Sequence, residues 1–69
     1  MKNYSIQITS VPDREKLVAE IWHKDSLIAE INQENIEMEL EIYIKKKKIK
    51  FMLNEFMEAV QEAKDSLSK

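Results

Sequence analysis

An alternating run near the middle of the chain constrains its fold more than any other feature. From residue 36 to residue 44, every even position is apolar. The odd positions hold acidic or aromatic residues: Glu37, Glu39, Glu41 and Tyr43. Successive side chains of a strand point to opposite faces, so the run predicts a strand over 36–44 with one apolar and one acidic face. The apolar face requires a second layer that keeps it from water.

The same alternation predicts four further strands, over 4–9, 17–23, 27–32 and 48–53. Pro12 ends the first of them, because proline cannot donate a backbone hydrogen bond to a ladder. Turn-forming residues separate the others, at 23–26, 32–35 and 45–48. Short turns between successive strands predict an antiparallel β-meander of four or five strands.

From Asn54 onward the apolar period changes to that of a helix. Apolar residues then recur at helical spacing: Phe56, Ala59, Val60, Ala63 and Leu67. Asn54 is the expected N-cap of a helix over 55–67. We therefore predict an α+β fold, a single domain over 1–69, in which one C-terminal helix packs on the apolar sheet face. The even side of the 36–44 run should lie under that helix.

The two faces of the middle strands follow from their alternation. The predicted core positions are Leu17, Ala19, Ile21, Leu27, Ala29 and Ile31, and the predicted outer positions are Val18, Glu20, Trp22, Ile28, Glu30 and Asn32. Cross-strand neighbours share a face, so the loop between these strands must have an odd number of residues. Residues 24–26 fit this requirement, with Asp25 in the left-handed conformation.

The composition excludes several classes of site. The 69 residues include no cysteine and no glycine, and His23 is the only histidine. The chain therefore cannot form disulfides, thiol nucleophiles or glycine-rich phosphate loops. None of its serines has an evident catalytic base. We expect no catalytic residues, no metal and no cofactor. His23 is expected to be a solvated turn residue. The N-terminus lacks an apolar signal core and no run could span a membrane, so we expect a cytoplasmic protein.

The outer sheet face is the predicted functional surface. It combines aromatic and aliphatic residues with carboxylates: Trp22, Ile28, Tyr43, Glu20, Glu30, Glu37, Glu39 and Glu41. Aromatic residues are enriched at protein interfaces, so this face predicts binding to a protein partner, as an inhibitor or regulator. The alternatives are a solvated face and a face covered by the N-terminal segment or lysine stems. A small domain without disulfides or metal also favours a homodimer.

The lysines near residue 47 open a second hypothesis. The net charge is −2, yet a tetralysine run, Lys45, Lys46, Lys47 and Lys48, precedes another lysine at position 50. Such a basic turn could contact nucleic-acid phosphates, and the acidic face could instead mimic a phosphate backbone. No interleaved aromatic residue offers a base-stacking platform, so direct nucleic-acid binding ranks below protein binding. The lysines could also be a solvated turn that protects a sheet edge.

The segment from Val11 onward resembles a group of small uncharacterised bacterial proteins. The resemblance is carried by residues 13–22, by Ile28-Ala29-Glu30-Ile31, by Glu41-Ile42-Tyr43 and by the Glu- and Ala-rich C-terminal helix. It implies a sheet-plus-helix fold and no particular activity. The Lys- and Ile-rich composition also resembles that of phage-type proteins from AT-rich genomes, among which small acidic inhibitors of host defence occur.

Overall fold

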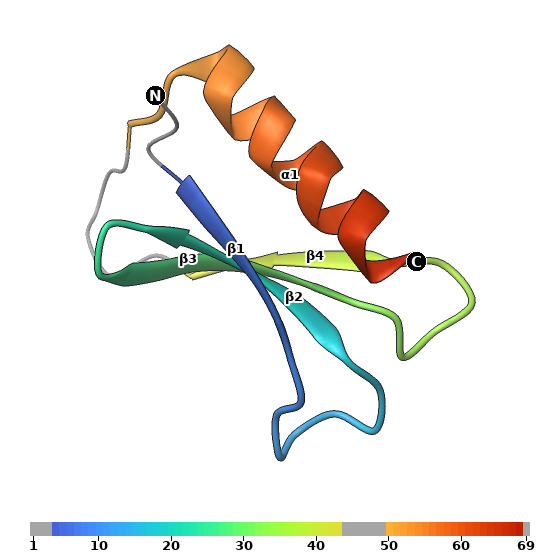
Figure 1. Cartoon of the computed structure of the whole chain (residues 1–69). Coiled ribbons are helices and arrows are strands. Elements are labelled where there is room, and N and C mark those ends of the chain that lie inside the picture. Colours follow the sequence, from blue (N-terminus) through green and yellow to red (C-terminus); the bar gives the residue numbers. More distant parts are fainter. Residues whose placement is uncertain (1–3, 44–49, 69) are drawn as a thin grey trace.

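The computed structural model describes residues 4–43 and 50–68, which form a four-stranded antiparallel sheet with one helix on one face (Figure 1). The strands are β1 (Tyr4–Thr9), β2 (Val18–His23), β3 (Ser26–Asn32) and β4 (Glu39–Ile42), and the helix is α1 (Leu53–Leu67). Each strand pairs with the next along the chain, in the order β1-β2-β3-β4. The predicted α+β meander with a C-terminal helix is confirmed.

Several predicted boundaries are wrong. Residues 36–38 precede β4 and are not part of it, so the described strand is shorter than the alternating run. Residues 50–52 are not in a strand and Leu53 begins the helix, which contradicts a strand over 50–53; residues 44–49 lie outside the described residues. Met52, and not Asn54, is the N-cap, because the Phe56 N–H already bonds to the Met52 carbonyl at 3.0 Å.

Helix α1 crosses the sheet above β1 and β2 (Figure 1). Its backbone lies close to fewer residues of β3, and no Cα atom of α1 comes within 8 Å of a Cα atom of β4. The core between the layers consists of Ala19, Ile21, Ile28, Ala29, Ile31, Ala59, Ala63 and Leu67. The predicted helical stripe is confirmed, since three of its residues are buried and Phe56 and Val60 pack against the core. Small alanines on α1 allow close approach to the sheet.

The expected solvated position of His23 is wrong. Its ring is half-buried and lies 5.3 Å from the Tyr4 ring and 6.1 Å from the Phe51 ring, between centroids. Phe51 stacks in turn on Phe56 at 5.2 Å. These aromatic contacts join the β1–β2 end of the sheet to the start of α1.

A bulge in β3 replaces the odd-length turn that the sequence predicted. His23 pairs with Ser26, so the turn holds two residues, and Lys24 rather than Asp25 has the positive φ, 56°. Ile21 pairs with Ala29 but Trp22 pairs with Leu27, which leaves Ile28 as an additional residue in β3. The additional residue restores the register that keeps apolar faces together.

The bulge also changes which side chains enter the core. Ile28, predicted to be on the outer face, is 5% exposed and belongs to the core. Leu27, predicted to be a core residue, is half-buried opposite Trp22. Leu17 is 50% exposed, outside the predicted core. Alternation alone cannot locate a bulge, because the additional residue shifts the pattern at one point only.

Candidate functional site

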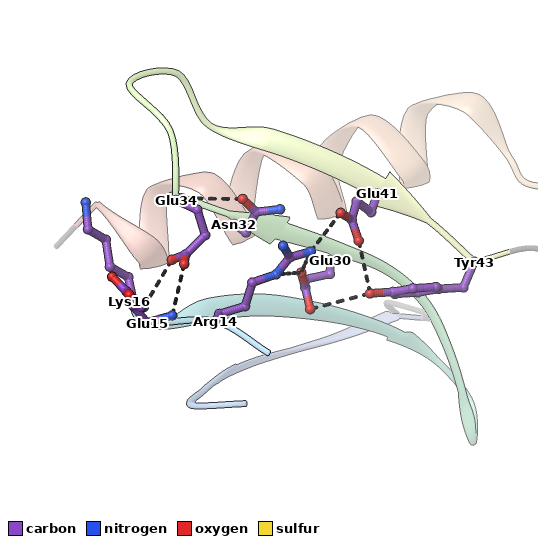
Figure 2. Close-up of polar contacts among 8 residues, drawn as sticks. All are labelled: Arg14, Glu15, Lys16, Glu30, Asn32, Glu34, Glu41 and Tyr43. Carbon is purple, nitrogen blue, oxygen red and sulfur yellow. Dashed lines mark hydrogen bonds and ion pairs between the residues drawn. The ribbon is translucent and has the colours of Figure 1, made fainter. Parts of the chain in front are cut away.

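The β1–β2 loop extends Arg14 across part of the outer face of the sheet (Figure 2). Arg14 Nε donates to Glu30 Oε2 at 3.1 Å, and its Nη2 lies 2.7 Å from Glu41 Oε1. Glu30 and Glu41 are directly opposite each other on β3 and β4, so one guanidinium can reach both carboxylates. The hydrogen bond to Glu41 raises the pKa of Arg14, against a smaller opposing effect of burial.

The two aromatic residues of this face are also held by contacts within the chain. The Tyr43 hydroxyl lies 3.5 Å from Glu30 Oε1 and 3.4 Å from Glu41 Oε2 (Figure 2). Burial, and then the charges of Glu30 and Glu41, raise the pKa of Tyr43 above its usual value. Trp22 Nε1 donates to Glu20 Oε1 at 3.1 Å. The Tyr43 hydroxyl and the Trp22 ring N–H therefore both have hydrogen-bond partners within the chain.

The β1–β2 loop is also held by hydrogen bonds to the β3–β4 loop. The Glu34 carboxylate accepts the backbone N–H of Glu15 at 2.9 Å and of Lys16 at 3.1 Å. The Glu15 hydrogen bond is the main cause that lowers the pKa of Glu34. Gln33 Nε2 donates to the Leu17 carbonyl at 3.2 Å. The β3–β4 loop thus holds the β1–β2 loop beside it.

The predicted outer interface is therefore only partly available. Glu30 is 4% exposed and Ile28 lies in the core, so the expectation that these two residues are surface contacts is wrong. Val18 and Asn32, also predicted to face outward, are fully buried. The other predicted residues divide into half-buried Trp22, Tyr43 and Glu20 and exposed Glu37, Glu39 and Glu41. The lysines at 45–48 lie outside the described residues.

Sequence reasoning missed the part played by Arg14. It is the only arginine in the chain, and it lies in a loop that carried no pattern. The available signal was the outer face itself, because several carboxylates on one sheet face need a cation nearby to avoid mutual repulsion. A single arginine, with its fork of donors, is the residue type suited to bridge two of them.

A different surface is open on the helix side of the sheet. Because the backbone of α1 lies over β1 and β2 and farther from β4, apolar side chains of the alternating run remain partly exposed there: Met38 by 37%, Leu40 by 42% and Ile42 by 48%. The expectation that the helix covers the even side of this run is therefore wrong. The helix and β4 enclose an open groove of about 530 Å³, lined by Ile31, Glu37, Met38, Glu39, Leu40, Val60 and Lys64. We refer to it as the β4 groove.

Exposed apolar residues continue from the β4 groove along the helix. The positions Leu53, Met57, Val60 and Lys64 follow one another at spacings of four, three and four, which places all four on one side of α1. Leu53 is 70% exposed and Met57 is 58% exposed. The groove thus has an apolar floor, one acidic border on β4 and one lysine on α1.

The described part of the chain contains neither a candidate metal site nor a candidate membrane-spanning helix. Across residues 4–43 and 50–68, no three histidine, aspartate or glutamate side chains are placed to hold a metal ion. None of the helices in these residues has the length and apolar character required to cross a membrane. The arrangement can present apolar surface and backbone groups to another molecule.

Comparison with known proteins adds no relative. No protein-family model matches this sequence, and neither the curated proteins nor the solved structures gave a significant match.

Proposed function

We propose that this chain is a non-enzymatic protein-binding domain, and that its contact surface is the β4 groove. The observation that carries the proposal is the position of α1, which lies over β1 and β2 and leaves Met38, Leu40 and Ile42 exposed side by side. Contiguous apolar surface with a polar border is typical of sites where proteins associate. Binding without chemistry fits an inhibitor or a regulator of the partner.

The composition of the groove supports the same function. Methionine is flexible and adapts to partner surfaces, and Met38 and Met57 both lie exposed along it. Glu37 and Glu39, two of the residues predicted as interface positions, border the groove. The outer face supports a contact less well, because Arg14 already binds Glu30 and Glu41 there.

The test places a photo-crosslinking amino acid, benzoylphenylalanine, at Leu40 and, as a matched control, at Gln7. Both positions are exposed strand residues, but Gln7 belongs to β1, opposite Glu20 on the outer face. We expect irradiation in cells to give a discrete protein adduct from position 40 and none from position 7. Equal adducts from both positions, or none from position 40, would overturn the proposal.

The same experiment addresses the predicted homodimer. An adduct of twice the mass of the chain would identify the second copy as the partner, and sedimentation of the wild type would then show the dimer. An adduct with another protein would identify a heterologous partner. The alternative function is nucleic-acid binding, for which the described residues offer no specific support. A crosslink to labelled nucleic acid added to the same preparation would indicate it.

A further inference from the structure

We infer that the outer edge of β4, beside the β4 groove, binds an extended segment of a partner protein, which adds to the sheet as a strand and alternates basic and apolar residues. This inference rests on the proposed function and specifies its partner. It depends on three properties of β4, namely its free backbone groups, its two-sided side-chain pattern and its charge.

The free backbone groups follow from the pairing of β4 with β3. The Tyr43 N–H donates to the Ile28 carbonyl at 2.9 Å, so this pair is hydrogen-bonded. Antiparallel pairs alternate between bonded and non-bonded, and the register pairs Ile42 with Ala29 and Leu40 with Ile31. These two pairs are therefore non-bonded, and the N–H and C=O groups of Leu40 and Ile42 point toward the outer edge of the sheet.

That edge is open in the described structure. β4 is the last strand of the sheet, with β3 as its only strand neighbour among residues 4–43 and 50–68. An edge with unpaired N–H and C=O groups is a template for another strand. Adding a strand to such an edge is a common way for a domain to bind an extended peptide, with main-chain bonds supplying affinity and alternate side chains specificity.

The side chains of β4 specify the pattern of the added strand. On the helix side, apolar side chains of the added strand would lie next to the exposed Leu40 and Ile42 and would shield them from water. On the other side, cross-strand neighbours of Glu39 and Glu41 would be stabilised by opposite charge. An occupant that alternates apolar residues with lysine or arginine satisfies both sides.

Charge also decides between a foreign strand and a second copy. In the antiparallel register that uses the free groups of Leu40 and Ile42 on both copies, the two Glu41 residues would be directly opposite each other. Such a non-bonded pair has Cα atoms about 4.5 Å apart, and like charges there are destabilising. Glu39 makes no ion pair within residues 4–43 and 50–68, so its charge is available to a basic partner.

The test uses the whole wild-type chain and short synthetic peptides, followed by amide hydrogen exchange in NMR spectra. The probe is acetyl-Lys-Val-Lys-Ile-Lys-Val-amide, and the controls are its glutamate counterpart and an N-methylated version that cannot bond to a strand edge. With free basic peptide at about ten times its Kd, exchange at the Leu40 and Ile42 amides should slow roughly tenfold. Amides of α1 provide the internal reference.

A charge-reversed variant makes the test specific. Glu39 is exposed, so Glu39→Lys should fold normally, and it should weaken binding of the basic peptide about two- to fivefold and strengthen binding of the acidic one. Equal protection by both peptides, protection by the N-methylated peptide, or none at all would overturn the inference. Protection that rises with protein concentration alone would assign the edge to a second copy.

The two proposals can fail separately. A Leu40 crosslink to a protein, without peptide protection of the Leu40 and Ile42 amides, would leave the protein-binding function and overturn the added strand. Absence of both would overturn both.

Discussion

Arg14 and Glu41 are 27 positions apart in the sequence, yet the guanidinium of one lies 2.7 Å from the carboxylate of the other. The contact joins the loop between the first two strands to β4, the last strand of the described meander. Through the same guanidinium, Arg14 also binds Glu30, whose side chain is 5% exposed. Arg14 therefore links the β1–β2 loop to β3 and β4 on the outer face of the sheet. On the opposite, helix-facing side, Leu40 and Ile42 of β4 remain partly exposed.

Replacing Arg14 by methionine should lower the free energy of unfolding. The methionine keeps an apolar stem but leaves the buried Glu30 carboxylate without its cation, and an unpaired buried charge is strongly unfavourable. Urea unfolding of Arg14→Met, Glu30→Gln and the double variant measures this. We expect the double variant to be more stable than Arg14→Met alone. Additive losses would show that the two side chains act independently.

Acid should release the loop contact made by Glu34. Its pKa is lowered in the folded state from the usual 4.5, so its contribution to stability is present above that value and is lost as the pH falls through the lower folded pKa. Glu34→Gln should therefore remove part of the acid dependence of the urea midpoint below pH about 4.5. Glu37→Gln, in the same connecting segment but outside this contact, is the control. An unchanged acid limb in Glu34→Gln would contradict the prediction.

Ile21 and Ile36 provide a matched pair for the core. Ile21 is fully buried between the sheet and α1, whereas Ile36 is fully exposed. Ile21→Val should lower the free energy of unfolding by about 0.5–1.5 kcal/mol, because it removes one buried methylene. Ile36→Val should change it by less than about 0.5 kcal/mol. Thermal or urea unfolding distinguishes them, and equal effects would place the core elsewhere.

The β2–β3 turn should be stabilised by glycine at one position only. Lys24 has a φ of 56°, which a residue with a Cβ adopts at a cost. Lys24→Gly should raise the free energy of unfolding by up to about 1 kcal/mol. Asp25→Gly, one residue later, removes no such strain and should not stabilise. Stabilisation by the second variant and not the first would show that the left-handed residue is Asp25.

Both tyrosines should titrate above their usual value of 10.0. Burial is the main cause for each, with a further contribution from Glu55 at Tyr4 and from Glu30 and Glu41 at Tyr43. A raised folded pKa means that stability is retained below pH about 10 and declines as the pH rises through the folded values. Ultraviolet absorbance of wild type and Tyr43→Phe separates the two groups. A normal titration in the folded wild type would contradict the contacts of Tyr43.

Local patterns were sufficient to predict most elements of the described fold. The alternation in residues 4–9 and 17–32 and the helical spacing from Phe56 to Leu67 correspond to β1, β2, β3 and α1. These patterns are reliable because a half-buried strand or helix must repeat its apolar residues with its own period. The prediction was less accurate at ends and irregularities, where the bulge at Ile28 reversed the faces of two residues.

The candidate site was harder to predict. The sequence indicated a protein-binding surface on the odd side of the 36–44 run. In the structure, the exposed apolar residues Met38, Leu40 and Ile42 lie on its even side. The position of α1 across the sheet depends on the shapes of both layers, and its small buried residues, Ala59 and Ala63, favour close packing over β1 and β2. No periodic signal in the sequence specifies how far a helix extends across a sheet.

The sequence by itself determined the element types, the antiparallel order and the two-sided character of β4, because these depend on short-range periodicity and turn chemistry. Only the tertiary structure decided that Arg14 bridges Glu30 and Glu41 on the outer face and that α1 leaves Leu40 and Ile42 partly exposed. Both results come from contacts between segments far apart in the chain, where side-chain reach and layer packing set the outcome. The alternating strand was therefore predictable from the sequence, but which of its faces remains open was not.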